Sequence, residues 1–368
     1  MLVIVEFDRR DPERWSMPDE LAELQELASS AGCNVIGSIN ARPDRPVAST
    51  LIGSGKLEEI AQAAAQQRAQ VVIFNQELSP AQQRNIEELV SVKTIDRTQL
   101  ILDIFAQRAR SQEGKVQVEL AQLRYLLPRL SGKGVMLSRL GGGIGTRGPG
   151  EQKLELDRRR IRQRISRVMQ ELEKLGRRRE ATRRQRQDAR VPVVAMIGYT
   201  NAGKTTLLNA VTGADSLTQN RPFTTLDPLA RRFRLPSGAP AILTDTVGFL
   251  HKLPHHLIEA FKATLEEAQD ANLLLHVLDA SHPMAVDQAE AVHHVVKALS
   301  LDGKPMVTVL NKIDQVAGQE VSAELRALPN PIAISAKLHQ GLAPLLQVVE
   351  NQITSADQTS APSGGFSP

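Results

Sequence analysis

The first 110 residues alternate between short apolar runs and longer stretches in which apolar residues recur every three or four positions. Short runs rich in valine and isoleucine predict β-strands, and the longer periodic stretches predict amphipathic helices. Ser79 followed by Pro80 favours a helix start at residue 80. Strands separated by helices predict a small parallel α/β domain over residues 1–110. The predicted strands are 2–6, 34–39, 71–74 and 92–95, and the predicted helices are 19–30, 57–68 and 80–90.

Residues 111–190 have the pattern of two helices joined by a segment rich in glycine. The first predicted helix, around residues 116–127, ends at Pro128. Residues 151–190 predict a long amphipathic helix, because their apolar residues are spaced three, four and seven apart. Residues 132–150 contain eight glycines, too many for regular structure. We expect a helical hairpin with a glycine-rich loop at its tip. The alternative is that the glycine-rich segment is a simple linker, although linkers rarely connect two long helices.

A Walker A motif opens the third part of the chain, which is predicted to be a Ras-like P-loop GTPase domain over residues 191–353. An apolar strand at 192–197 precedes the motif and a helical pattern at 206–211 follows it, which is the context that a P-loop requires. Main-chain amides wrap the phosphates, Lys204 reaches the β- and γ-phosphates, and the Thr205 hydroxyl ligates Mg²⁺. The residues of this motif expected to bind nucleotide are Gly198, Tyr199, Thr200, Asn201, Ala202, Gly203, Lys204, Thr205 and Thr206.

Three further motifs follow strand-like runs in the order expected for a GTP-binding protein. Asp245 is expected to hold Mg²⁺ through water, and the Gly248 amide to contact the γ-phosphate. Asp314 accepts hydrogen bonds from guanine N1–H and the N2 amino group, a donor pair that adenine lacks, and so selects GTP over ATP. Asn311 braces the loops, the Lys312 stem packs over the base, and the Ala336 amide donates to guanine O6. The motifs are Asp245-Thr246-Val247-Gly248, Asn311-Lys312-Ile313-Asp314 and Ser335-Ala336-Lys337.

The segment 222–228, with the sequence PFTTLDP, is the candidate for the switch that senses the γ-phosphate. A switch threonine gives its hydroxyl to Mg²⁺ only when the γ-phosphate is present. We assign this role to Thr225, with Thr224 as the alternative. The expected catalytic residues are Lys204, Thr225 and Gly248, and the expected Mg²⁺ ligands are Thr205, Thr225 and Asp245. Phe249 stands where Ras has its water-positioning glutamine, so intrinsic hydrolysis should be slow and helped from elsewhere.

A basic block lies in a chain whose net charge is only +4. Residues 153–190 contain 15 Lys/Arg and six Asp/Glu, so the rest of the chain is mildly acidic. This imbalance indicates a polyanionic partner; a solvated helix face balanced by its own acidic residues is the alternative. We expect arginines of the loop and of the long helix to contact RNA phosphates. They are Arg139, Arg147, Arg158, Arg159 and Arg160.

Composition narrows the class of protein further. Cys33 is the only cysteine, which excludes an intrachain disulfide and fits a reducing, cytoplasmic environment. No apolar run approaches the ~20 residues that a membrane span needs, and we expect no stable membrane anchor. Residues 354–368, rich in serine, proline and glycine, are expected to form a disordered tail. His251, His255 and His256 have no cysteine near them and predict a switch-region surface rather than a zinc site.

Four strings beyond the nucleotide motifs carry a resemblance to a known family. They are IDRTQLILDIF at 95–105, GGGIGTRGPGE at 141–151, LELDRR at 154–159 and DTVGFLHKLPHHLIEAF at 245–261. On these strings, the chain resembles the HflX family of ribosome-associated GTPases over nearly its whole length. The resemblance implies binding to the 50S ribosomal subunit and its RNA, with the N-terminal part near the peptidyl-transferase region. It also implies splitting or rescue of stalled ribosomes under stress.

Several alternatives stay open. The chain could be a GTP-regulated RNA-binding or remodelling protein in which hydrolysis only resets affinity, or a GTPase acting on tRNA modification or membrane complexes. Asn201 suggests K⁺ as a further ligand, because related GTPases with asparagine there use potassium. Gly53-Ser54-Gly55-Lys56 lacks the Walker spacing and predicts a strand-to-helix turn, with the second nucleotide site suggested for family members as the alternative. We expect a monomer without a DNA partner.

Overall fold

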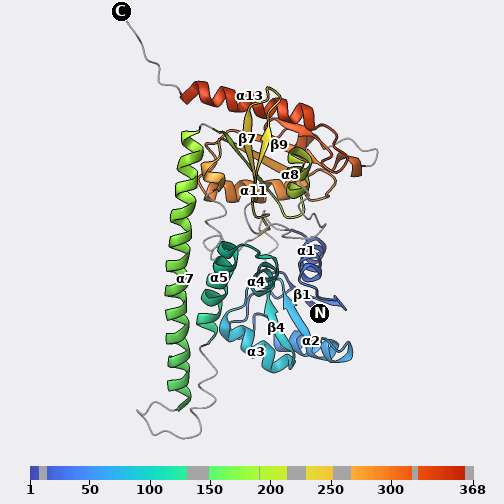
Figure 1. Ribbon diagram of the computed structural model, residues 1–368. Coiled ribbons are helices and arrows are strands. Elements are labelled where there is room, and N and C mark those ends of the chain that lie inside the picture. Colours follow the sequence, from blue (N-terminus) through green and yellow to red (C-terminus); the bar gives the residue numbers. More distant parts are fainter. Residues whose placement is uncertain are drawn as a thin grey trace, which may run out of the picture. The chain divides into compact units, whose positions relative to one another are not determined.

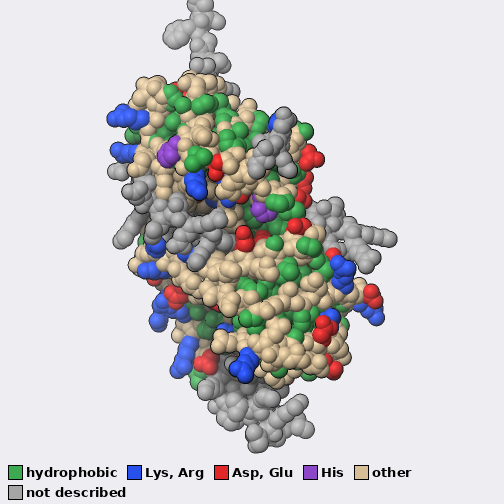
Figure 2. Space-filling model, turned by 90° about the vertical axis from the view of Figure 1, so that its right-hand side faces the viewer, with side chains coloured by type: hydrophobic (Ala, Val, Ile, Leu, Met, Phe, Trp, Pro, Cys, Tyr) green, Lys and Arg blue, Asp and Glu red, His purple; other side chains and the backbone are tan. Residues whose placement is uncertain are grey.

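The computed structural model of the chain describes residues 1–7, 15–130, 149–189, 191–213, 229–251, 267–316 and 322–360 (Figure 1). The chain divides into two compact units, Met1–Leu175 and Gly176–Pro368. Among these residues, no helix is both long enough and apolar enough to span a membrane. On the face drawn in Figure 2, acidic and basic side chains are interspersed among apolar and uncharged ones.

The first unit contains a four-stranded parallel sheet in the order β2-β1-β3-β4. This confirms the predicted α/β fold, although β2 begins at Ser38 rather than at residue 34, because its ladder with β1 starts opposite Leu2. Ser79 caps α3 and forms a capping box with Gln82, so this helix begins at residue 80 as predicted. The elements are β1 (Leu2–Val5), α1 (Met17–Ser30), β2 (Ser38–Ala41), α2 (Ser54–Gln66), β3 (Val71–Phe74), α3 (Pro80–Val90), β4 (Lys93–Asp96) and α4 (Arg97–Arg108).

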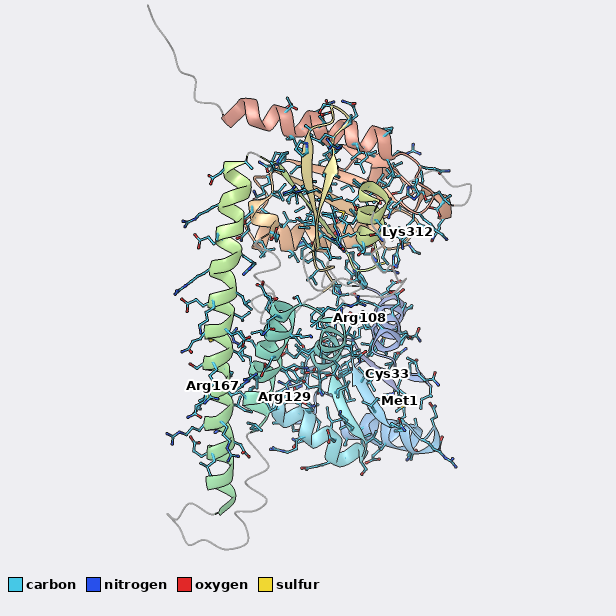
Figure 3. The ribbon with its side chains drawn as sticks, in the orientation of Figure 1. Met1, Cys33, Arg108, Arg129, Arg167 and Lys312 are labelled. Carbon is cyan, nitrogen blue, oxygen red and sulfur yellow. The ribbon has the colours of Figure 1, made fainter. Side chains whose placement is uncertain are left out.

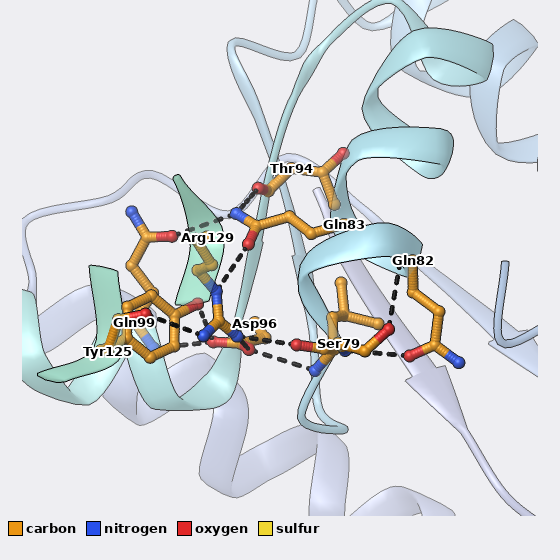
Figure 4. A network of polar contacts seen from close by, with 9 residues as sticks. Ser79, Gln82, Gln83, Thr94, Asp96, Gln99, Tyr125 and Arg129 are labelled. Carbon is orange, nitrogen blue, oxygen red and sulfur yellow. Dashed lines mark hydrogen bonds and ion pairs between the residues drawn. The ribbon is translucent and has the colours of Figure 1, made fainter. Parts of the chain in front are cut away.

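Asp96, at the end of β4, ties three helices to this sheet (Figure 4). Its carboxylate is fully buried and accepts hydrogen bonds from Leu78 N (3.1 Å), Gln99 N (2.8 Å), Tyr125 Oη (2.9 Å) and Arg129 (3.1 Å). Burial, together with the charge of Asp96, raises the pKa of Tyr125, so its hydroxyl keeps the proton it donates. Leu78 precedes α3, Gln99 is in α4, and Tyr125 and Arg129 are in the last turns of α5 (Gln112–Arg129), so one carboxylate anchors the C-terminal end of α5.

Helices α5 (Gln112–Arg129) and α7 (Pro149–Asp188) form the predicted hairpin. Gln112 Nε2 donates to Glu171 Oε1 (2.7 Å), and Arg164 NH2 donates to Glu119 Oε2 (2.8 Å). From the first pair to the second, the partner on α5 lies seven residues later and the partner on α7 seven residues earlier, so the two helices are antiparallel. Val116 and Leu120 of α5 pack against Val168 of α7 between them. The predicted end of the first helix at Pro128 was wrong by a residue, because Leu130 N still bonds to Leu126 O and closes the last turn.

The second unit is built on a six-stranded sheet in the order β10-β9-β8-β5-β7-β6, parallel except for the edge strand β6. The central strand β5 is buried along its whole length, as its apolar sequence predicts. This confirms the predicted P-loop GTPase fold. The elements are β5 (Val193–Gly198), α8 (Lys204–Thr212), β6 (Leu229–Arg234), β7 (Pro240–Asp245), β8 (Leu273–Asp279), α11 (Ala285–Ala298), β9 (Met306–Asn311), η1 (Ile313–Gln315), α12 (Ala323–Arg326), β10 (Pro331–Ala333) and α13 (Leu342–Ser360).

Helix α13 continues to Ser360, seven residues beyond residue 353, where the GTPase domain was predicted to end. The added residues contain neither glycine nor proline, which begin only at Pro362. Thr354 Oγ1 and Ser355 Oγ donate to carbonyl oxygens four residues earlier, a local bond that is compatible with a helix. The predicted tail boundary at 354 therefore falls inside the helix, and residues 361–368 lie outside the described part of the chain.

His276 occupies the middle of β8, between Ile197 of β5 and Thr308 of β9. It is fully buried, and neither ring nitrogen has a hydrogen-bond partner among the described residues. The ring of His293 in α11 meets it edge-on, with centroids 5.1 Å apart. Burial, with smaller contributions from His293 and Lys204, lowers the pKa of His276 to about 3, so this histidine is neutral in the folded protein.

A change from pH 7 to pH 5 is expected to cost the wild-type protein more stability than a His276→Leu variant. The unfolded chain takes up a proton below pH 6.5, whereas folded His276 stays neutral until the pH nears 3. The contribution of neutral His276 to the free energy of unfolding is therefore complete above pH 6.5 and is lost as the pH falls. The loss is about 2 kcal/mol at pH 5. Urea unfolding followed by circular dichroism measures this difference; equal losses in the two proteins contradict it.

Candidate functional site

The loop between β5 and α8 encloses the side chain of Lys204. Lys204 is only 6% exposed, and its Nζ donates to the carbonyl oxygens of Gly198 (3.0 Å) and Tyr199 (2.9 Å). Burial lowers the pKa of Lys204 to about 8, while the charge of Asp245 opposes the shift, so the ammonium is protonated at pH 7. Asn201 and Gly203 adopt left-handed conformations, with φ of 63° and 93°. The first amides of α8 have no acceptor within the helix, so with Lys204 they provide a site for phosphate.

Thr205 and Asp245 meet beside this loop. The Thr205 hydroxyl donates to Asp245 Oδ2 at 2.7 Å, and both side chains are buried. The β5–β7 register pairs Met196 with Asp245, which brings the end of β7 next to the loop. A hydroxyl and a carboxylate are hard oxygen donors of the kind that Mg²⁺ prefers, so the pair fits that ion. The third predicted ligand, Thr225, lies outside the described residues, as does Thr224.

Gly248, three residues after Asp245, packs directly against the loop. A Cβ atom at this position would lie 2.8 Å from Thr200 Cα and 3.1 Å from Lys204 Nζ, so the close approach requires glycine. Thr246, between them, donates from Oγ1 to Met196 O (2.6 Å). Sequence reasoning thus assigned Asp245 and Gly248 to one site, and the structure brings both to Lys204 and Thr205.

Asn311, the last residue of β9, links two loops of the site. Its Nδ2 donates to Ala202 O (2.9 Å), and its Oδ1 accepts from Ala336 N (3.0 Å). A Cβ at Gly203 would collide with the same side-chain amide. The bracing role expected for Asn311 is therefore present in the geometry. The Ala336 amide was expected to donate to guanine O6, and in this structure it donates to Asn311 Oδ1 instead.

Asp279 is a residue of this site that sequence reasoning missed. It ends β8 opposite Asn311, and its Oδ2 lies 2.6 Å from the Nζ of Lys312. Lys312 follows β9 in the chain and is labelled in Figure 3. The signal in the sequence was an acidic residue at the end of an apolar strand-like run. Asp314 is exposed in η1 and open to a ligand. In the third motif, Ser335 is buried and Lys337 exposed.

Comparisons with known proteins agree with this geometry. Residues 18–106, 108–186 and 193–312 match the families described as "GTP-binding GTPase N-terminal", "GTP-binding GTPase Middle Region" and "50S ribosome-binding GTPase". The GTPase HflX of Caldanaerobacter subterraneus subsp. tengcongensis is 51% identical, over 91% of this chain and 77% of that protein. The GTPase HflX of Escherichia coli K12 is 44% identical, over 91% and 79%. The chain belongs to the HflX family of GTPases.

Membership of the HflX family makes the chain a GTPase that binds guanine nucleotide. A solved complex of the protein SsGBP with GDP is similar in fold, with a TM-score of 0.50 and 25% identity. The similarity covers 98% of this chain and 99% of that one.

Other predicted features of this HflX-family chain lie away from the nucleotide site. Arg139 and Arg147 fall outside the described residues, whereas Arg159 and Arg160 are exposed on α7 and Arg158 is half-buried there. The motif at 53–56 was predicted to be a strand-to-helix turn, and it forms the start of a helix: Gly53 is the N-cap of α2, and Lys56 pairs with Glu59 within it. Of the three predicted switch histidines, the structure describes His251 alone, and it is buried.

Proposed function

We propose that the chain hydrolyses GTP to GDP and phosphate at the site around Lys204. The observation that carries this proposal is the buried ammonium of Lys204 beside the paired oxygens of Thr205 and Asp245. Lys204 attracts the β- and γ-phosphates, the amides of residues 198–206 surround them, and the Gly248 amide meets the γ-phosphate. Asp314, with the motif at 335–337, reads the guanine base.

Mg²⁺ is the metal that we propose for this site, with Thr205, Asp245 and Thr225 as its protein partners. When bound, the ion would neutralise charge that develops on the phosphate oxygens. The structure supports Thr205 and Asp245 through their shared hydrogen bond. A role for K⁺ at Asn201 stays a prediction.

Phe249 supports the proposal that hydrolysis is slow in the free protein. Its side chain is 2% exposed and apolar, so it offers no group to orient the attacking water. The gap between a resting and an activated GTPase reaches roughly 10⁵-fold when a partner completes the site. We propose that the large ribosomal subunit is this partner.

We propose, further, that the chain is a cytoplasmic monomer that binds the 50S subunit and splits or rescues stalled ribosomes. The match to a family described as "50S ribosome-binding GTPase" and the basic residues of α7 support this proposal. A GTP-regulated RNA-binding protein is the second candidate, favoured by the same basic helix. Cosedimentation with 50S subunits tests the ribosomal role. The amount of a ribosome factor that sediments with the subunits should differ between a GTP analogue and GDP.

Adding 50S subunits at low salt is expected to raise the GTPase rate, and high salt is expected to remove the increase, because phosphate contacts weaken with salt. Replacing Arg139 and Arg147 together with glutamine should reduce the stimulation while leaving nucleotide affinity of the free protein unchanged. Phosphate release, measured with and without 50S subunits, checks both statements. If the subunits leave the rate unchanged at low salt, the ribosomal role is wrong and a GTPase with another partner remains.

A further inference from the structure

The segment that follows β7 leaves the sheet briefly and then pairs with the P-loop. The β5–β7 ladder ends at the pair Met196–Asp245, and pairing resumes at Tyr199–Phe249. The steps between these pairs differ, three residues on the β5 side and four on the β7 side. One extra residue on a single strand is the pattern of a β-bulge, a feature found beside many active sites. Gly248 lies in this bulge.

Three hydrogen bonds fix the returning segment to the P-loop. Thr200 N donates to Phe249 O (2.8 Å), and Phe249 N donates to Gly198 O (3.0 Å). The third comes from His251 N, which donates to the hydroxyl of Tyr199 at 2.7 Å. Tyr199 is 3% exposed, so this bond is shielded from water. The first two bonds join main-chain groups and are available to almost any sequence, whereas the third requires a tyrosine hydroxyl.

The bulge holds the Gly248 amide beside Lys204 without giving it an acceptor. Gly248 is buried, and its amide has no hydrogen-bond acceptor among the described residues. A Cβ at this glycine would lie only 3.1 Å from Lys204 Nζ, so Gly248 lies directly beside the ammonium group. A buried amide without an acceptor is costly, and an anionic oxygen at this place would satisfy it.

We propose that Tyr199 is a positioning residue that sets how strongly the site prefers GTP to GDP. This inference rests on the nucleotide site proposed above. Only a triphosphate carries the γ-phosphate that can accept from the Gly248 amide. The Tyr199 hydroxyl holds His251, three residues past Gly248, and so keeps the bulge closed against the P-loop. GDP leaves the Gly248 amide unused, so its affinity does not depend on this bond.

The test is the substitution Tyr199→Phe, which keeps the buried ring and removes only the hydroxyl. Affinities of the full-length protein for fluorescently labelled GDP and for a non-hydrolysable GTP analogue are measured by titration. The analogue affinity is expected to fall about fivefold, the size expected from losing one hydrogen bond, and the GDP affinity to stay within about twofold. Tyr125→Phe is the matched control, because it removes a hydroxyl bonded to Asp96 at 2.9 Å in the other unit. It should change neither affinity.

Equal weakening of both nucleotides overturns the inference, since it would mean a merely structural role for the hydroxyl. An unchanged or increased affinity for the analogue overturns it as well. If the wild-type protein binds neither nucleotide, the proposed function fails and the inference fails with it. Should the variant not fold, amide hydrogen exchange at His251 in the wild type decides: slower exchange with the analogue than with GDP supports the inference, and equal exchange overturns it.

Discussion

Replacing Lys204 with alanine is expected to weaken GTP binding at least about 100-fold, because hydrogen bonds to charged groups contribute about 1.5–3 kcal/mol each and the lysine serves two phosphates. The structure strengthens this expectation. Lys204 is held by two carbonyl oxygens in a buried position and needs no rearrangement of a flexible surface side chain to meet a ligand. Titration with labelled GTP and GDP measures the loss.

Lys297→Ala is the control for the Lys204 variant. Lys297 is exposed in the last turn of α11, so its removal takes away the same charge without touching the loop. Circular dichroism and thermal melting establish that both variants are folded. Tight GTP binding by a folded Lys204→Ala protein would show that the site lies elsewhere.

Replacing Asp314 with asparagine is expected to lower GTP affinity about 100-fold and to make xanthosine triphosphate the better ligand. A carboxylate accepts two hydrogen bonds from guanine, whereas the amide of asparagine offers a donor that matches the carbonyl oxygen on C2 of xanthine. A site built for one hydrogen-bonding pattern rejects the other strongly, since polar groups are left unpaired. Competition between the two triphosphates for the labelled nucleotide gives both affinities.

The Asp314 assignment has a matched control in Asp302→Asn. Asp302 is exposed in the turn before β9, so replacing it with asparagine removes the same charge at a position away from the guanine motif. It should leave the preference for GTP unaltered. Unchanged GTP affinity in the Asp314→Asn protein would show that Asp314 does not recognise guanine. The phosphate site at Lys204 would be unaffected by this result, because the Lys204→Ala variant tests it separately.

The amino-acid sequence was sufficient for features that depend on neighbouring residues. Apolar periodicity predicted the parallel sheet of the first unit and the long helices, and Ser79-Pro80 predicted the start of α3. The antiparallel edge strand β6 of the second sheet was not predicted. The Walker A motif could be recognised because its loop is contiguous, so spacing alone places Lys204 and Thr205 at the start of a helix. Helix ends were less secure: α5 passes Pro128 and α13 passes residue 353, since a last turn persists wherever its own hydrogen bonds close.

Tertiary structure alone decided which residues that are far apart in the chain come into contact. The pairs Lys312–Asp279, His251–Tyr199 and Arg129–Asp96 are 33, 52 and 33 residues apart in the chain. No local pattern encodes such pairs, because they arise from strand order and from the register between strands. A slip of one residue turns every side chain of a strand to the other face. The bulge that sets Gly248 beside Lys204 is one such offset, and it is visible only after β5 and β7 are paired.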